Sequence, residues 1–176
     1  MPATRTPVMM NDKENRHMQT HAHTTMLPEA EAVWEQYQRI LSEVFRWADG
    51  LSDAQLKWSP TGKDTNTLGN LISHTMGAGL FAVTDRIGGE PMARDRQAEF
   101  TAPVTREQLN QRRVDFEMRV REALAKLTPA DLERVVAPPA GGGQTTVRKL
   151  LVYTVAHLSQ HMGQVILTRK LLDGQL

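Results

Sequence analysis

The chain has 176 residues, 40% of them hydrophobic, and a formal net charge of +1, which allows one domain with a core and shows no basic excess typical of nucleic-acid binding. The absence of cysteine excludes a disulfide scaffold, thiolate metal ligands and a cysteine nucleophile, so a metal ion would need histidine, carboxylate, water or ligand atoms. No apolar run approaches the roughly 20 residues of a membrane span, and we expect a cytoplasmic protein without a nucleic-acid or membrane partner.

Residues 1–26 differ in character from the rest of the chain. They are polar, show no hydrophobic periodicity and lack the apolar middle of a secretory signal. We interpret them as a disordered tail before one domain over residues 27–176. The histidines of this segment, His17, His21 and His23, are interpreted as solvated side chains and not as metal ligands.

The first two long helices are predicted over residues 28–48 and 67–87. The first has apolar residues at helical spacing and ends at Asp49-Gly50. Thr67 is the expected N-cap of the second, and two glycines end it. His74 lies on a mostly apolar face of this helix, where Gly77 and Ala78 leave open space one turn further on. A lone inward histidine is usually a core residue with its hydrogen bonds satisfied. His74 is therefore a candidate metal ligand only together with other histidines of the chain.

The middle of the chain is predicted to hold one more long helix between irregular segments. Residues 90–103 contain two prolines and mixed charge, and we expect no regular structure there. A helix follows over 105–127, where Thr105 and Gln108 have capping-box spacing. Short helical turns are expected to begin at residues 52 and 128 for the same reason, and 137–143 is a flexible connector too irregular for a phosphate loop.

The last helix, over residues 145–172, contains a histidine pair. His157 and His161 are one turn apart, on the flank of an apolar stripe, so their ring nitrogens can approach one point. Such a pair alone is compatible with two partly buried imidazoles that bond to backbone or water. With His74 it gives three candidate nitrogen ligands for one ion.

Four long amphipathic helices without a convincing strand pattern predict an all-α four-helix bundle. Its intermediate connections are long enough to cross the bundle, so a simple up-down-up-down order does not follow. Ala156, Ser159 and Gly163 form a strip of small residues on the last helix. This strip fits a close neighbour within the bundle as well as it fits a second copy of the chain.

The sequence resembles the DinB-like superfamily over about residues 28–174. The resemblance rests on the segment Leu-Ile-Ser-His74, on Trp-Ser-Pro60, on the Gly-rich approach to the last helix, and above all on His157-Leu-Ser-Gln-His161-Met-Gly-Gln-Val. It implies a DinB-like four-helix bundle, often a homodimer, that binds one divalent metal ion through His74, His157 and His161. Some relatives use such an ion to activate a low-molecular-weight thiol such as bacillithiol or mycothiol.

The residues and the resemblance together lead to a functional hypothesis. A three-histidine site leaves a coordination position open for a small-molecule substrate, which is typical of catalytic sites. We expect zinc or nickel, with iron or copper as alternatives, and a thiol-dependent S-transferase. The alternatives are a metal-dependent hydrolase and a non-catalytic metal-binding bundle. Gln164 and Asn70 are candidate outer-sphere or substrate contacts.

Overall fold

A computed structural model describes residues 26–60, 65–139 and 141–174 of the chain. The predicted tail over residues 1–26 lies outside these residues, apart from Met26. The long helices are α1 (Pro28–Ala48), α3 (Leu68–Leu80) with its π-helical continuation η1 (Phe81–Ile87), α5 (Arg106–Ala125) and α7 (Val147–Leu172). The short elements are α2 (Asp53–Leu56), α4 (Arg96–Thr101), α6 (Pro129–Glu133) and the strands β1 (Val135–Val136) and β2 (Thr145–Thr146).

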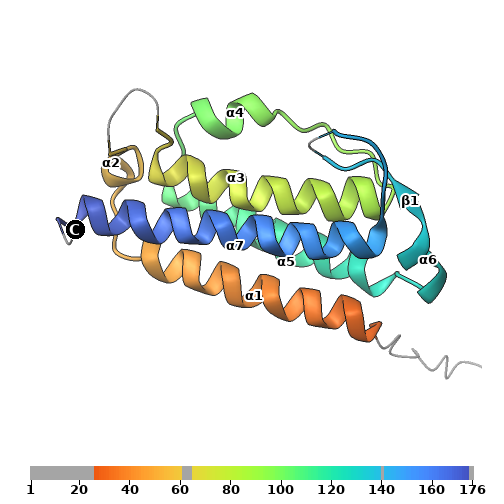
Figure 1. The fold of residues 1–176 in the computed structure, drawn as a ribbon. Helices are drawn as coiled ribbons and strands as arrows, with labels where there is room; N and C mark the ends of the chain where they lie inside the picture. The colour runs from red at the N-terminus through yellow and green to blue at the C-terminus, as the bar shows by residue number, and fades with distance from the viewer. Residues whose placement is uncertain (1–25, 61–64, 140, 175–176) are drawn as a thin grey trace, which may run out of the picture.

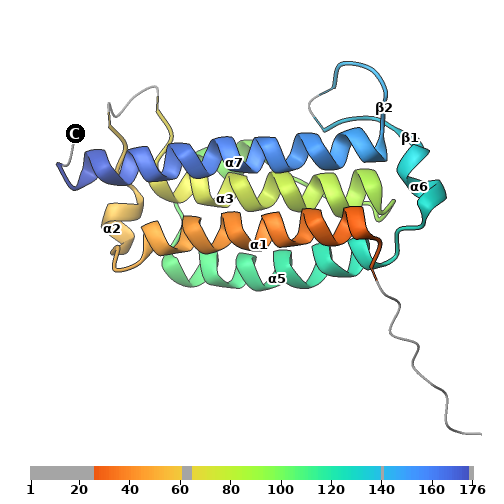
Figure 2. The same ribbon diagram turned by 60° about the horizontal axis from the view of Figure 1, so that its bottom comes forward.

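The long helices form a four-helix bundle, which confirms the predicted all-α class (Figure 1). In the bundle, α7 packs between α1 and α3, and α5 closes the other side against the same two helices. Helices α3 and α5 run in the same direction, so the chain returns along the bundle between them through the segment that contains α4 (Figures 1 and 2). The connection between α3 and α5 therefore does run along the bundle, whereas the one between α5 and α7 stays at one end, and the order is not up-down-up-down.

Side-chain caps account for most helix boundaries. The side chains of Thr67, Thr105 and Thr146 accept hydrogen bonds from backbone amides at the starts of α3, α5 and α7. The Thr105/Gln108 capping box is present as predicted. Helix α7 begins two residues later than expected, because Thr145 and Thr146 pair antiparallel with Val136 and Val135 in a two-stranded ladder.

The segment over residues 90–103 differs from the prediction of irregular structure. It contains α4, and the N-cap of this helix is Asp95, whose side chain accepts a hydrogen bond 2.9 Å long from the amide of Ala98. Asn70 of α3 holds the end of α4, because its Nδ2 donates to the carbonyl oxygens of Glu99 and Ala102 at 2.9 and 3.0 Å. The sequence did not predict α4, because a helix of six residues is too short to show a hydrophobic periodicity and because Asn70, which holds it, lies far away in the sequence.

The core of the bundle contains one buried polar contact between α1 and α7. The Tyr37 hydroxyl donates to Thr154 Oγ1, which in turn donates to the Leu151 carbonyl at 2.8 Å. The Tyr37 ring also packs edge-on against Phe116 of α5, with 5.8 Å between ring centroids. Burial raises the pKa of Tyr37, so this hydroxyl stays protonated and acts as a structural donor. Among the described residues, none of the helices is both long enough and apolar enough to cross a membrane.

Candidate metal centre

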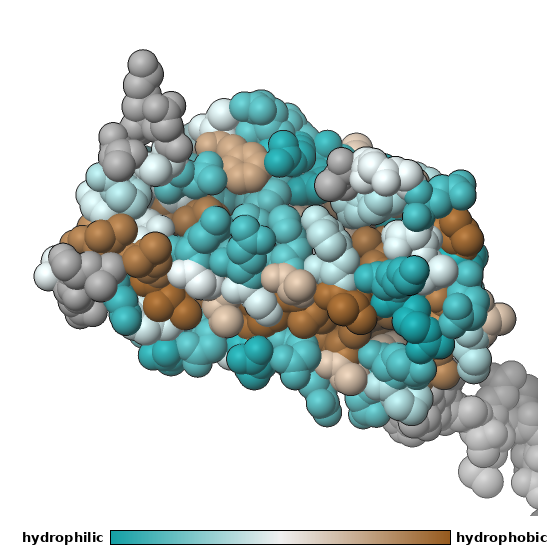
Figure 3. Space-filling model, viewed as in Figure 1, coloured by the Kyte–Doolittle hydropathy of each residue, from teal (hydrophilic) through white to brown (hydrophobic). Residues whose placement is uncertain are grey.

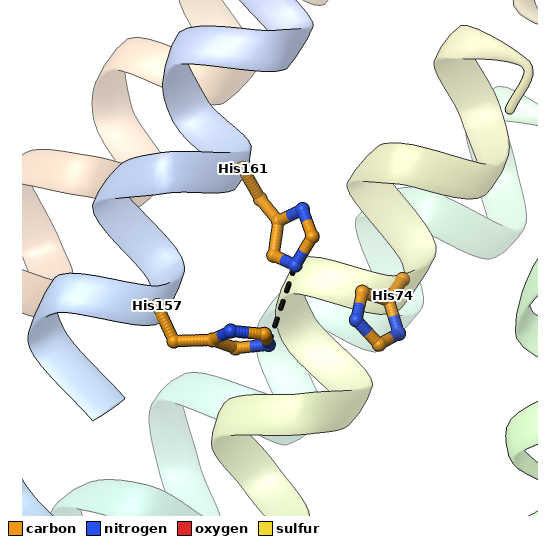
Figure 4. A group of neighbouring side chains, drawn as sticks. All are labelled: His74, His157 and His161. Atoms are coloured by element: carbon orange, nitrogen blue, oxygen red, sulfur yellow. Dashed lines mark hydrogen bonds between the residues drawn. The ribbon is translucent and has the colours of Figure 1, made fainter. Parts of the chain in front are cut away.

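Neighbouring helices α3 and α7 bring the three predicted histidines together. His74 comes from α3, and His157 and His161 come from successive turns of α7, so that the imidazole rings face one another (Figure 4). His74 and His161 are buried, with 4% and 9% of their surface exposed, and His157 is half-buried. One ring nitrogen from each lies within 4.8 Å of the other two. The fold therefore brings His74 into one cluster with a pair of histidines that follows it by 83 or more positions in the sequence.

The spacing of the ring nitrogens is compatible with one metal ion. His157 Nε2 and His161 Nε2 are 3.3 Å apart. Two nitrogens bound to one zinc ion in tetrahedral geometry also lie about 3.3 Å apart, given Zn–N distances of roughly 2.0–2.1 Å. The His74 ring centroid is 4.7 Å from that of His161 and 5.7 Å from that of His157. The α7 pair thus already has the spacing of two ligands, and a ring nitrogen of His74 lies within 4.8 Å of both.

Hydrogen bonds at Nδ1 leave the Nε2 lone pairs of two of these rings directed toward the cluster, where His161 Nε2 is within hydrogen-bond distance of His157 Nε2 (Figure 4). His74 Nδ1 is 2.8 Å from Glu99 Oε2, and His161 Nδ1 is 2.6 Å from Gln164 Oε1. A carboxylate and an amide oxygen only accept hydrogen bonds, so both Nδ1 atoms carry the proton. The unprotonated Nε2 atoms are then available as ligands, and this bonding pattern is the one that orients histidines in known metal sites.

Glu99 is fixed on its other side by Arg94. The Nε and one terminal nitrogen of Arg94 bond to the two carboxylate oxygens, both at 2.6 Å, in a bidentate pair. Burial alone would raise the pKa of Glu99, but the hydrogen bonds from His74 and Arg94 outweigh burial and hold it below its usual value. Glu99 is therefore an anion at neutral pH, as the His74 tautomer requires.

Gly77 makes room for this carboxylate. A Cβ atom at position 77 would lie 2.3 Å from Glu99 Oε1, closer than real Cβ contacts come. Glu99 thus fills the space directly beside Gly77. Gly77 also borders a cavity of about 310 Å³, and Ala78 borders the cavity next to the histidines. Asn70, proposed from sequence as a site contact, donates both its amide hydrogen bonds to the backbone of α4 and accepts one from Thr67. Its observed bonds hold the helix that carries Glu99.

Burial keeps the α7 histidines neutral. It lowers the pKa of His157 from 6.5 to about 4, with further contributions from the charges of His161, His74, Arg94 and Arg96. Burial also lowers the pKa of His161, although the hydrogen bond to Gln164 offsets part of this effect. Neutral imidazoles are the form that binds metal ions, so protons compete weakly for this site at neutral pH.

A small cavity of about 80 Å³ adjoins the cluster. His74 and His157 form one part of its wall, and Tyr153 stacks on the His157 ring with 5.8 Å between centroids. The remaining wall residues are Ala78, Ala82, Arg94, Arg96, Pro139 and Thr154. A ligand in this cavity would lie beside two of the three histidines.

Sequence reasoning missed Glu99, Arg94 and Arg96, which all lie in the segment predicted to be irregular. Nothing in the sequence near position 99 indicates a partner, because His74 precedes it by 25 residues. The Gly77 position gave an indirect indication, since a glycine in the middle of a helix often marks a close approach. Tyr153 was also missed, although it precedes His157 by one helical turn.

Comparisons with known proteins agree with this architecture. A family model described as the DinB superfamily matches residues 36–165, and no curated protein sequence matches the chain. A DinB-like protein from Bacillus cereus has a similar structure, with a TM-score of 0.65 and 17% identity, over 82% of this chain and 92% of that one. A conserved protein from Enterococcus faecalis has a TM-score of 0.61 and 14% identity, over 82% of this chain and 97% of that one. A DinB-like protein from Bacillus subtilis has a TM-score of 0.59 and 18% identity, over 81% of this chain and 92% of that one.

At these identities the structural similarities concern the fold alone. The family model, in contrast, is a match at the level of sequence, and it extends over 130 of the 176 residues. The matched range contains His74, His157 and His161. The chain therefore belongs to the DinB superfamily.

Proposed function

We propose that His74, His157 and His161 bind one divalent metal ion in a catalytic site, and that the favoured reaction is transfer of a low-molecular-weight thiol to an electrophilic substrate. The observation that carries this proposal is the cluster of three ring nitrogens within 4.8 Å, next to a cavity. Zinc or nickel is the expected ion, with iron or copper as alternatives, because imidazole suits all four. A cytoplasmic location is part of the proposal, since low-molecular-weight thiols are kept reduced there.

The choice of a catalytic over a structural site is supported by the number of candidate protein ligands, which is three among the described residues. Structural zinc sites are closed by four protein ligands, whereas catalytic sites have three and leave a position for water or substrate. When bound, a divalent ion lowers the pKa of a thiol or water that coordinates it and so supplies a nucleophile near neutral pH. His74 and His157 border the cavity of about 80 Å³, which places an incoming ligand beside the cluster.

The protein's own residues keep this arrangement in place. Glu99 holds His74, Gln164 holds His161, and Tyr153 stacks against His157. Each ring therefore has a separate support that fixes its orientation before any ligand binds. Preorganised ligands lose less conformational freedom on binding, which favours a metal affinity high enough for a resident ion.

Metal content tests the proposal directly. We expect elemental analysis of the purified full-length chain to give about one divalent metal ion per chain, and His74→Ala or His157→Ala to lose it while remaining folded. A chain that binds no divalent ion would overturn the proposal.

If metal is present, a cobalt-substituted sample distinguishes the reactions: new absorption on addition of a thiol supports the transferase. Hydrolysis without thiol binding supports the hydrolase. A cobalt site that exchanges neither thiol nor water supports a non-catalytic bundle.

We also propose that a second copy of the chain packs against α7. The small residues Ala156 and Gly163 are exposed, and a Cβ atom at position 163 would meet no atom within 4 Å, so none of the described helices packs against Gly163. Val152 and Leu167 flank it with 67% and 51% of their surface exposed. Figure 3 shows brown apolar areas over α7 and along its border with α1. A homodimer would bury this strip.

A further inference from the structure

Arg96 is a charged residue at the cavity that the arrangement of the histidines does not use. It is exposed, is the first residue of α4 and forms part of the cavity wall together with His74 and His157. Its guanidinium carbon lies 5.2 Å from the centroid of the Phe100 ring. The Phe100 ring in turn lies 4.3 Å from that of His74. Arg96 is thus connected to the candidate metal site through a single aromatic ring.

The charges around the cavity are not balanced. Both carboxylate oxygens of Glu99 are bonded to Arg94, so this pair is neutral overall. Arg96, in contrast, has no carboxylate partner within the described part of the chain. None of the described residues that line the cavity is acidic. A divalent ion at the histidines would add to the positive charge of Arg96, and a positive cavity attracts anions.

The contact with Phe100 leaves the N–H groups of Arg96 available. Among the described residues, its guanidinium group makes no hydrogen bond or ion pair and only lies over the face of the ring. These N–H groups match the two oxygens of a carboxylate. The ring also restricts the motion of the side chain, which reduces the conformational entropy lost when a ligand binds.

We propose that Arg96 binds a carboxylate group of the small molecule that enters this cavity, and that the preferred thiol therefore carries a carboxylate. This inference rests on the proposed function, since it assigns a chemical class to the thiol of the same site. His74, His157 and Arg96 line the same small cavity. A sulfur atom at the histidines and a carboxylate at Arg96 can therefore belong to one small molecule.

Two simple thiols test this inference on the cobalt-loaded full-length protein. We would titrate 3-mercaptopropionate, which carries a carboxylate, and 2-mercaptoethanol, which does not, and follow the sulfur-to-cobalt absorption band. We expect the native protein to bind the carboxylate thiol more tightly, and Arg96→Gln to reduce the ratio of the two affinities by about tenfold, in the range of a hydrogen bond to a charged group. A carboxylate can also coordinate cobalt, so the change in this ratio is decisive and not the preference of the native protein alone.

Arg121→Gln is the matched control. It removes the same charge from an exposed position on α5, outside the cavity wall, and should leave the ratio unchanged. Elemental analysis checks that each variant retains one cobalt per chain. An unchanged ratio in Arg96→Gln, or an equal loss in Arg121→Gln, overturns the role of Arg96 while thiol binding stands. Failure of the native protein to bind cobalt or either thiol overturns the proposed transferase itself.

Discussion

The carboxylate of Glu99 lies 2.8 Å from Nδ1 of His74, although 25 residues separate the two along the chain. This contact fixes the imidazole so that Nε2 points toward the α7 histidines. Arg94 holds the same carboxylate in a bidentate pair, and the missing side chain of Gly77 makes room for it. The candidate metal site thus depends on a short helix that contributes no candidate ligand of its own.

Replacement of Glu99 by Gln should weaken metal binding without removing it. An amide offers one acceptor oxygen in place of two, so it cannot bond to both His74 and Arg94 as the carboxylate does. Loss of such an outer-sphere partner typically lowers metal affinity about 10–100-fold. A competition titration with a chromophoric chelator measures this change. Glu117→Gln, which breaks an ion pair with Arg113 on α5, is the control and should retain native affinity.

Replacement of Gly77 by Ala should lower metal affinity through Glu99. The added Cβ atom would lie 2.3 Å from Oε1, so the carboxylate must move away from His74. In a Glu99→Ala background there is no carboxylate to displace, and the same substitution should have little further effect on affinity. Chelator competition on the four proteins of this cycle gives the coupling energy. Additive effects would contradict the proposed link between Gly77 and Glu99.

The metal-free protein should lose stability as the pH falls below about 6.5. The folded protein holds the pKa of His157 at about 4, whereas in the unfolded chain it returns to about 6.5. The unfolded state therefore binds more protons between these values, and the free energy of unfolding decreases as the pH falls through this window. Urea unfolding of chelator-treated protein at several pH values measures the slope. His157→Ala should reduce this slope, and an unchanged slope would exclude His157 as its source.

Replacement of Leu167 by Glu should separate the proposed homodimer. The side chain is 51% exposed on the apolar strip of α7, so a charge there costs little in a monomer but is unfavourable in a buried interface. Light scattering coupled to size exclusion should give a dimer for the native chain and a monomer for the variant. Val114→Glu, at a 58% exposed position on α5, is the control and should leave the mass unchanged. A monomeric native chain would contradict the proposed dimer.

The sequence by itself determined the long helices and the positions of the three histidines. Helix ends depend on local contacts such as the Thr105/Gln108 capping box, and the α7 pair lies on one face because a helix repeats every 3.6 residues. These interactions join residues a few positions apart, so a single sequence is enough to predict them. Residues 81–87 show the limit of this reasoning, since the expected continuous helix changes there to π-helical geometry, for which we have no physical account.

Only the tertiary structure decided what surrounds the histidines. Asn70 proved to hold the backbone of α4, and α4 brings Glu99 to His74 and Arg96 to the cavity. The small strip around Gly163 likewise proved to face outward, which periodicity alone did not indicate. The physical reason is common to these cases. Each contact joins segments that are distant in the chain, so it forms, and contributes to the free energy of folding, only when the bundle has packed.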